Sequence, residues 1–279
     1  MNSPASKLVL GTVQFGCNYG INSAGRPSGA EVQRILDLAL CSGITALDTS
    51  SAYGDAESVI GSCGAARFRL VSKYPEGGGN IADALRASLQ RLRTDSLHGY
   101  LLHHFSVWRR DAGVWDEFKR LRDSGLSDRI GFSLYSPEEL ELLLENGVDF
   151  SLLQFPRNIL DRQFDQYLPE LKSRGVEIHV RSTFLQGLFF KDRLALPQKL
   201  LPLRDALEQI DREAVSLGIS VSDLALSFNL CNPLIDGVLI GVDNAAQLQA
   251  DLASAASARA IDLDINVTKR ELLNPVNWK

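Results

Sequence analysis

The stretch ITALDTSSAYG at residues 44–54 decides how this chain folds and what it does. It opens with a short apolar run, residues 44–47, of the kind that forms a buried strand. Asp48, three small hydroxyl residues and Tyr53 follow almost at once. Enzymes built on α/β barrels carry their reactive groups at the carboxyl ends of the strands. The stretch therefore predicts a barrel strand that ends in chemically active side chains.

Two later apolar runs also end in titratable residues, one at Lys73 and one at His103. Because the carboxyl ends of parallel strands meet at one edge, we expect Asp48, Tyr53, Lys73 and His103 to lie close together. Taken singly, each residue also has a structural explanation, since Asp48 could cap the next helix and Lys73 could be solvated. The four together favour a catalytic site.

Strand-like and helix-like segments alternate along the whole chain, which is typical of βαβ units around a parallel sheet. We predict an α/β fold, a (β/α)8 TIM barrel, as a single domain over residues 1–279 with a C-terminal tail at 258–279. The predicted strands are 7–11, 44–47, 68–72, 99–102, 129–133, 150–155, 177–182 and 237–242. The predicted helices are 31–41, one beginning near 55, 81–92, 115–122, one beginning at 136, 161–173, 203–217, 221–230 and 244–256, with a loop at 105–114.

Composition excludes several other classes of protein. With 45% hydrophobic residues the chain can bury a large core, yet no apolar run is long enough to cross a bilayer. The first residues do not form a secretion signal, so we expect a cytoplasmic protein. A net charge of −5, without a Lys/Arg-rich run, argues against a nucleic-acid partner. The four cysteines form no CxxC pair, which argues against a zinc site or a disulfide framework.

Four motifs in this order resemble the aldo-keto reductases over nearly the whole chain. They are LGTVQFG at 10–16, GITALDTSSAYG at 43–54, SK at 72–73 and LLH at 101–103. Later similarities are GFSL at 131–134, Gln154, LQGL at 185–188 and VLIGV at 238–242. The resemblance implies an NAD(P)H-dependent reductase of aldehydes or ketones on a TIM barrel, with a nicotinamide as the hydride source.

The resemblance assigns roles that the chemistry of the four residues also supports. Tyr53 would be the proton donor, although a free tyrosine, with a pKa of ~10, is a poor one at neutral pH. Lys73 would lower that pKa by roughly 1–3 units, and Asp48 would keep the lysine charged and oriented. His103 would hydrogen-bond the carbonyl oxygen.

The cofactor positions match the family unevenly. Ser133 and Gln154 stand where relatives hold the nicotinamide carboxamide, but Leu134 replaces the usual asparagine. Arg181 stands where an aromatic ring often stacks on the nicotinamide, and a guanidinium can also stack.

The stretch GVDNAAQ at 241–247 is expected to face the adenosine through Gly241, Asp243 and Gln247. It lacks the cation that commonly binds the 2′-phosphate of NADPH. The cofactor is therefore NADPH or NADH, with weak discrimination or a preference for NADH, unless Lys191 or Arg193 supplies the charge.

The substrate is expected to be a small carbonyl compound, polar or anionic, such as a keto-sugar derivative. This expectation rests on His104, Trp108 and Arg109, with Arg110 and Arg157 nearby in the predicted loops. His98 and His179 are expected to be structural, and no metal site is predicted.

Two other functions stay open at this point. A barrel lysine can form a Schiff base, which would make the chain a lyase with Lys73 as nucleophile. The same barrel could also bind a nicotinamide as a regulator without turnover, because fold alone does not establish catalysis.

Overall fold

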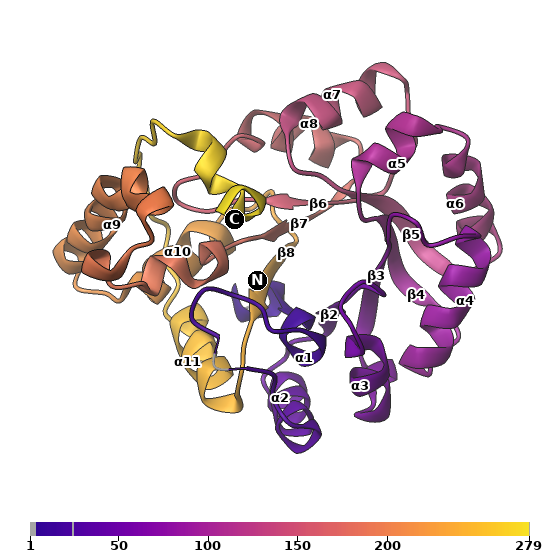
Figure 1. The fold of residues 1–279 in the computed structure, drawn as a ribbon, viewed down its shortest axis with the longest axis horizontal. Helices are drawn as coiled ribbons and strands as arrows, with labels where there is room; N and C mark the ends of the chain where they lie inside the picture. Colours follow the sequence, from indigo (N-terminus) through magenta and orange to yellow (C-terminus); the bar gives the residue numbers. More distant parts are fainter. Residues whose placement is uncertain (1–3, 24, 279) are drawn as a thin grey trace.

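The computed structural model describes residues 4–23 and 25–278 and is a closed barrel of parallel strands surrounded by helices (Figure 1). The strands neighbour one another in chain order, and the last pairs with the first. Their bounds are β1 Leu8–Gly11, β2 Ala46–Asp48, β3 Arg69–Tyr74, β4 Leu97–Leu102, β5 Ser127–Ser133, β6 Leu152–Pro156, β7 Glu177–Arg181 and β8 Gly237–Gly241. The predicted (β/α)8 barrel is confirmed.

Helices cover the outside of the barrel. The α-helices are α1 Val13–Gly16, α2 Gly29–Cys41, α3 Ala56–Ser62, α4 Ile81–Leu92, α5 Phe105–Arg110, α6 Val114–Asp123, α7 Pro137–Glu145, α8 Leu168–Ser173, α9 Arg204–Leu217, α10 Val221–Leu230 and α11 Ala245–Ala256. The 3-10 helices are η1 Pro4–Lys7, η2 Ala65–Arg67, η3 Asp165–Tyr167, η4 Leu185–Phe190, η5 Arg193–Ala195, η6 Gln198–Leu203, η7 Arg270–Leu273 and η8 Pro275–Trp278. Helix α11 begins as predicted, because the side chain of Asn244 accepts a hydrogen bond from the Gln247 N–H at 2.9 Å.

Strand register sets the positions of the polar residues. The barrel interior contains an apolar layer of three fully buried side chains, Val71, Leu101 and Leu152. Because side chains alternate along a strand, residues two positions further on face the same interior, nearer the carboxyl ends. These positions hold Lys73, His103 and Gln154. The apolar layer thus lies directly beneath the polar residues of the barrel mouth.

Two predicted segments differ from the structure. The region predicted as a loop at 105–114 contains helix α5, because Phe105 and Trp108 pack together with ring centroids 5.4 Å apart. The helix predicted at 161–173 is shorter and begins with η3 at Asp165. Asn158 and Asp161 exchange backbone hydrogen bonds at 3.0 Å, and this turn uses the groups that a longer helix would need.

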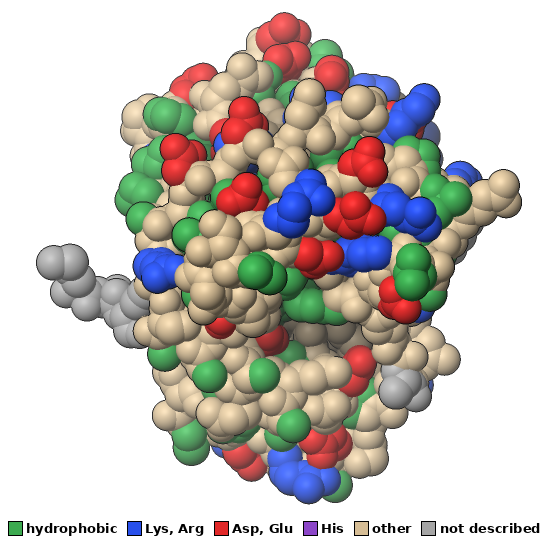
Figure 2. Space-filling view, turned by 90° about the vertical axis from the view of Figure 1, so that its left-hand side faces the viewer, with side chains coloured by type: hydrophobic (Ala, Val, Ile, Leu, Met, Phe, Trp, Pro, Cys, Tyr) green, Lys and Arg blue, Asp and Glu red, His purple; other side chains and the backbone are tan. Residues whose placement is uncertain are grey.

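A second hydrophobic cluster lies outside the barrel. It joins η4, α9, α10 and the chain after residue 258 through buried side chains that include Leu188, Leu207, Phe228, Ile265 and Leu272. The C-terminal segment is thereby held beside α9 and α10 (Figure 1). Figure 2 views the molecule from the α9 side and shows acidic and basic side chains intermixed on that face. None of the helices in the described part of the chain is both long and apolar enough to cross a membrane.

Candidate active site

A buried ion pair lies at the centre of the barrel mouth. Lys73 Nζ donates to Asp48 Oδ1 at 2.5 Å and to the Thr49 carbonyl at 2.9 Å. The other carboxylate oxygen of Asp48 accepts from Gln154 Nε2 at 2.7 Å. Lys73 is 0% and Asp48 is 2% exposed. The structure therefore brings together residues from β2, β3 and β6, as the sequence predicted for Asp48 and Lys73.

Burial and the carboxylate act on Lys73 in opposite directions. Burial lowers the pKa of Lys73, and Asp48 opposes this both as a charge and as a hydrogen-bond acceptor. The two buried charges compensate one another and have little contact with water, so added salt screens them only weakly.

Tyr53 lies above this pair in the loop after β2. Its half-buried ring has its centroid 5.2 Å from Lys73 Nζ and 5.7 Å from the centroid of His103, which it meets edge-on. Gly16 supports the loop from behind, because a Cβ on Gly16 would lie 1.8 Å from the Tyr53 carbonyl oxygen. The predicted neighbourhood of Tyr53, Lys73 and His103 is thus present in the structure.

The pKa of Tyr53 moves in the direction opposite to the prediction. Burial raises this pKa, and the carboxylate of Asp48 raises it further, while Arg181 lowers it by a smaller amount. Asp48 neutralises Lys73, so the expected lowering by the lysine does not prevail. Tyr53 is therefore a protonated phenol at neutral pH, which is the form that a proton donor requires.

His103 is held by contacts on two sides. Its Nδ1 lies 3.1 Å from Ser50 Oγ, and its ring stacks on that of His104 at a centroid distance of 4.7 Å with an angle of 5° between the planes. Burial lowers the pKa of His103 to about 2, and Lys73, His104 and Arg181 contribute in the same direction. The imidazole is therefore neutral at physiological pH.

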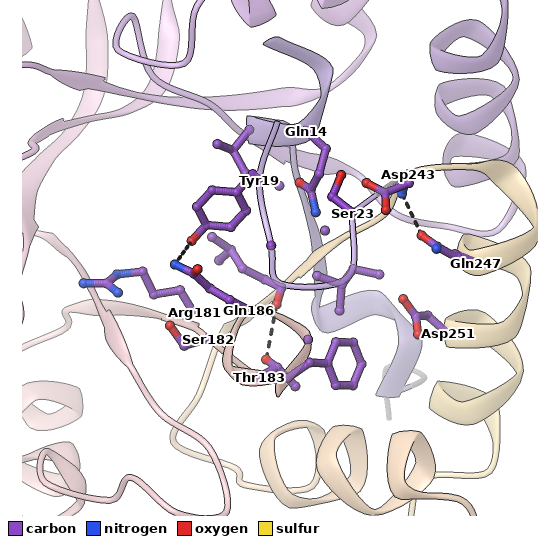
Figure 3. A pocket seen from close by; sticks show the side chains of 18 of the residues that line it. Gln14, Tyr19, Ser23, Arg181, Ser182, Thr183, Gln186, Asp243, Gln247 and Asp251 are labelled. Carbon is purple, nitrogen blue, oxygen red and sulfur yellow. Dashed lines mark hydrogen bonds between the residues drawn. The ribbon is translucent and has the colours of Figure 1, made fainter. Parts of the chain in front are cut away.

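A cavity of about 530 Å³ opens beside Tyr53 and extends to α11 (Figure 3). Asp48, Tyr53 and Gln154 are among its lining residues, and so are Asp243, Gln247 and Asp251, which lie side by side near α11. Five of the six predicted cofactor residues line it: Gln154, Arg181, Gly241, Asp243 and Gln247. Ser133 is buried at the end of β5 and is not among the lining residues.

Polar atoms of this cavity lack protein partners. Gln14 Oε1 and Asp243 Oδ1 are buried without a hydrogen bond in the described part of the chain. An added Cβ at Gly241 would lie 2.5 Å from Gln14 Nε2, so the glycine lets the Gln14 side chain lie against the strand in its present position. A cavity of about 530 Å³ with unpaired acceptors in its wall fits a large polar molecule with hydroxyl and amide donors, such as a nicotinamide dinucleotide.

Two segments form the roof of the cavity. The loop after α1 contacts η4 through the Ile21 N–H and the Gln186 carbonyl at 3.0 Å, and through Asn22 Nδ2 and the Gly187 carbonyl at 2.8 Å. Gln186 Nε2 also donates to the Tyr19 hydroxyl at 2.8 Å (Figure 3). The sequence, with Gly20, Gly25 and Pro27, predicts a rim loop at 17–28, and the LQGL motif lies in the other segment, but no individual roof residue was predicted.

Arg181 extends to the opposite side of the cavity from Asp243 and Asp251 (Figure 3). Its guanidinium lies 4.1 Å from the ring centroid of Tyr135 and donates to the Leu134 carbonyl at 3.0 Å. The side chain therefore stacks on a protein ring in this structure. It is also the single cation among the lining residues of the cavity that belong to the described chain.

A second cavity, of about 270 Å³, lies on the other side of Arg181. Its walls come from the loops after β5 and β6 and from the C-terminal segment, and its polar members are Tyr135, Asp161, Gln163, Arg181, Arg270, Glu271, Asn274 and Asn277. Burial raises the pKa of Asp161 to about 6, although hydrogen bonding by Gln163 and the charge of Arg270 lower it. Arg181 lines both cavities, so the second cavity adjoins the first at this residue.

The predicted substrate residues lie mostly elsewhere. Trp108 is buried in the hydrophobic core on α5, and Arg109 lies over the Phe105 ring at 5.3 Å, so neither lines a described cavity. Arg110 pairs with Glu76 on the surface. His104 stacks on His103 at the edge of the site.

Arg157 was also expected to face the substrate, and this expectation is wrong. The side chain is 4% exposed and makes two hydrogen bonds to Asp165, at 2.7 and 3.0 Å. It also donates to Asn229 Oδ1 at 2.8 Å. The guanidinium is thus fully used in joining β6 to α10.

The other two histidines lie at the opposite end of the barrel. His98 and His179 both contact Glu177, at 2.9 and 3.0 Å, and Arg129 pairs with the same carboxylate at 2.7 Å. Within residues 4–23 and 25–278, no group of three or more His, Cys, Asp or Glu side chains is arranged to hold a metal ion.

Comparisons with known proteins agree with this geometry. The sequence profile of the Aldo/keto reductase family matches residues 7–265. The uncharacterized oxidoreductase YqkF of Bacillus subtilis (strain 168) is 23% identical, over 93% of this chain and 92% of its own. The L-galactose dehydrogenase of Arabidopsis thaliana is 25% identical over 69% of this chain and 64% of its own.

The fold is also similar to that of solved structures. The holo form of aldo-keto reductase AKR11C1 from Bacillus halodurans superposes with a TM-score of 0.74 at 23% sequence identity, covering 92% of this chain and 88% of that one. The family profile, the barrel and the order of its motifs lead to one conclusion: this chain is an oxidoreductase that belongs to the aldo/keto reductase family.

Proposed function

We propose that the protein reduces an aldehyde or ketone to an alcohol with NADH or NADPH. The observation that carries this proposal is the Asp48–Lys73 pair beneath Tyr53, beside a cavity of about 530 Å³ whose lining extends to helix α11. Gln154, Gly241, Asp243 and Gln247 would hold the cofactor, and the bound nicotinamide would supply hydride to the carbonyl carbon.

The residues of the chain supply the proton and the orientation. Tyr53 protonates the carbonyl oxygen as negative charge develops there. Asp48 and Lys73 hold a compensated charge beneath the ring, and this makes the phenolate less costly at the moment of transfer than an isolated buried phenolate would be. His103, which is neutral, donates a hydrogen bond to the same oxygen and orients the substrate.

The acidic end of the cavity favours NADH over NADPH. A 2′-phosphate carries roughly −1.5 to −2 charges near neutral pH. Asp243 and Asp251 line this end, and burial raises the pKa of Asp251 to about 7, so a carboxyl there is still partly ionised. Arg193 does not supply the missing cation, because it pairs with Asp211 at 2.8 Å. We expect weak discrimination or a preference for NADH.

The second cavity indicates the substrate class. A carboxylate at Asp161 can accept hydrogen bonds, while Arg181 and Arg270 can donate them. A vicinal diol both donates and accepts, and Asp161 and Glu271 offset the charges of Arg181 and Arg270, so the cavity has no excess of cations for an anionic substituent. We therefore propose that the substrate carries hydroxyl groups beyond its carbonyl, as a polyhydroxylated aldehyde or ketone does.

The Schiff-base alternative is weaker in the structure than in the sequence. A nucleophilic lysine needs a free lone pair that a substrate carbonyl can reach. Lys73 is fully buried, its hydrogen bonds go to Asp48 and Thr49, and it does not line the cavity. Borohydride added with a carbonyl substrate would label Lys73 if the lyase alternative were correct.

The decisive experiment has two steps. NADH and NADPH are first titrated into the protein and binding is followed by tryptophan fluorescence, and then an activated aromatic aldehyde is added and oxidation of the cofactor is recorded. Binding with turnover supports the reductase. Binding without turnover of any aldehyde or ketone would favour a regulator, and no binding at millimolar concentration would exclude both.

A further inference from the structure

The hydroxyl group of Ser50 lies next to His103 Nδ1, where it can determine which ring nitrogen carries the hydrogen. Ser50 is 0% exposed, in the loop between Asp48 and Tyr53. Its Oγ accepts a hydrogen bond from the Ala52 N–H at 3.1 Å and lies 3.1 Å from His103 Nδ1. Within the described chain, Oγ makes no other hydrogen bond.

This arrangement leaves one choice for the hydroxyl hydrogen. A serine hydroxyl has one hydrogen and two lone pairs, and the Ala52 N–H already uses a lone pair. If Nδ1 carried a hydrogen, the Ser50 hydroxyl hydrogen would be buried without an acceptor, which is unfavourable. The hydroxyl therefore donates to Nδ1. The neutral ring then carries its own hydrogen on Nε2.

The surroundings of His103 hold the ring in this orientation. The His104 ring lies parallel to it, and the Tyr53 ring meets it edge-on. The His103 backbone is fixed by its N–H, which donates to the Tyr74 carbonyl at 3.0 Å. His103 Nε2 forms no hydrogen bond with any residue in the described ranges, so no protein group there competes for it. His103 itself is not among the lining residues of the two cavities, but its ring meets that of Tyr53, which lines the larger one.

We propose that Ser50 is a positioning residue that fixes the imidazole of His103 as its Nε2–H tautomer, so that Nε2 can donate to the substrate carbonyl. The part of this proposal that concerns the carbonyl rests on the proposed reductase function. The part that concerns the tautomer does not, and it can be measured in the protein without substrate.

The test uses the small number of histidines. The chain has four, so protein labelled with ¹⁵N-histidine gives a spectrum in which each ring can be assigned, with His103→Gln identifying the signals of His103. Two-bond ¹⁵N–¹H couplings distinguish Nδ1–H from Nε2–H. We expect His103 to be Nε2–H in the wild type, without titration between about pH 5 and 9. In Ser50→Ala we expect a tautomer mixture or Nδ1–H.

Kinetics provide the second readout. Ser50→Ala should lower kcat about tenfold with unchanged cofactor affinity, the effect of losing one oriented hydrogen bond. Ser50→Thr keeps the hydroxyl and should recover both the tautomer and most of kcat. Ser127→Ala is the matched control, because Ser127 is also 0% exposed but donates to the Arg129 carbonyl at the opposite end of the barrel.

The outcomes separate cleanly. An Nδ1–H tautomer in the wild type would overturn the proposal, and so would a Ser50→Ala protein that keeps both the Nε2–H tautomer and the wild-type kcat. If no carbonyl compound is reduced but the tautomer changes as expected, the reductase function fails while the role of Ser50 toward His103 stands.

Discussion

The two ends of the barrel each contain a buried carboxylate, and the two are used differently. Glu177, at the amino-terminal end of β7, contacts His98, His179 and Arg129. Burial acts to raise the pKa of Glu177, but hydrogen bonds from the two histidines overcome it, so the pKa is lowered overall. Asp48, at the carboxyl end of β2, contacts Lys73 and Gln154.

The difference lies in what surrounds each carboxylate. At the amino-terminal end, side chains from three strands converge on Glu177. His179 Nδ1 is buried there without a partner in the described chain, but the residues of this cluster line neither of the two cavities above. At the mouth, Gln14 Oε1 and Asp243 Oδ1 are buried without a partner in the described chain, and both residues line the cavity of about 530 Å³. Unpaired buried polar atoms cost free energy, so those that line a cavity indicate where a ligand binds. We therefore interpret the Glu177 carboxylate as stabilising the fold, and the Asp48 carboxylate as part of a ligand-binding site.

The largest effect is expected at Tyr53. Tyr53→Phe removes the proposed proton donor and should lower kcat by roughly 10²–10⁴-fold, while cofactor affinity and Tm stay close to wild type. Tyr74→Phe is the matched control, because the Tyr74 hydroxyl donates to the Gly79 carbonyl and does not line the cavity. Steady-state kinetics with cofactor titration measure both. Wild-type turnover by Tyr53→Phe would disprove the assignment.

Lys73 should affect both function and stability. Lys73→Met leaves the Asp48 carboxylate buried without its cation, so we expect turnover nearly as low as for Tyr53→Phe and a loss of about 3–5 kcal/mol of stability. Adding Asp48→Asn removes the unpaired charge and should restore much of that stability without restoring turnover. Urea unfolding of the single and double variants measures this. Recovery of turnover in the double variant would show that the pair is structural only.

Substitution of Glu177 should affect stability but not turnover. Glu177→Gln should lower stability by about 1–3 kcal/mol while kcat changes less than twofold.

The lowered pKa of folded Glu177 also makes the stability of the protein depend on pH. Ionised Glu177 adds to the free energy of unfolding above the unfolded pKa of ~4.3, and this stabilisation is lost as the pH falls through the lower pKa of the folded state. Unfolding experiments at pH 7 and in acid should show a smaller pH effect for the variant, and a large loss of kcat would contradict the comparison.

The smallest effect concerns the cofactor. Asp243→Lys places a cation where the cavity has a carboxylate and should raise NADPH affinity relative to NADH about tenfold, the effect of one exposed charge-assisted hydrogen bond. Asp192→Lys, in an exposed loop position outside the cavity lining, controls for net charge. Dissociation constants decide the matter. Wild-type protein that binds NADPH more than about a hundredfold tighter than NADH would show that another residue supplies the cation.

The sequence predicted those parts that depend on strand periodicity. Asp48, Lys73 and Gln154 lie within strands, so the two-residue repeat and the order of the barrel place them on one interior face. The helices with regular apolar patterns were also predicted closely, with α4 and α10 matching at both ends.

The roof of the cavity and the second cavity could not be predicted in this way. Gln186 has a φ of 52°, a left-handed conformation that is uncommon for glutamine and that its residue type does not predict. The second cavity combines Asp161, Arg181 and Arg270, which lie far apart in the sequence. The direction of the Tyr53 pKa depends on burial and on the neutralisation of Lys73, and both require coordinates. Trp108 and Arg157 were misjudged because apolar or charged character does not reveal which way a loop residue packs.

The apolar layer of Val71, Leu101 and Leu152 has a consequence for how changes at the two ends combine. It separates the charge clusters, and β7 spans roughly 13 Å between Glu177 and Arg181 at about 3.3 Å per residue. Sites this far apart that share no partner contribute independently to the free energy of unfolding. Substitutions at the mouth and at Glu177 should therefore be additive in a double-mutant cycle. Such additivity would let the mouth acquire new specificities during evolution without compensating changes at the base of the barrel.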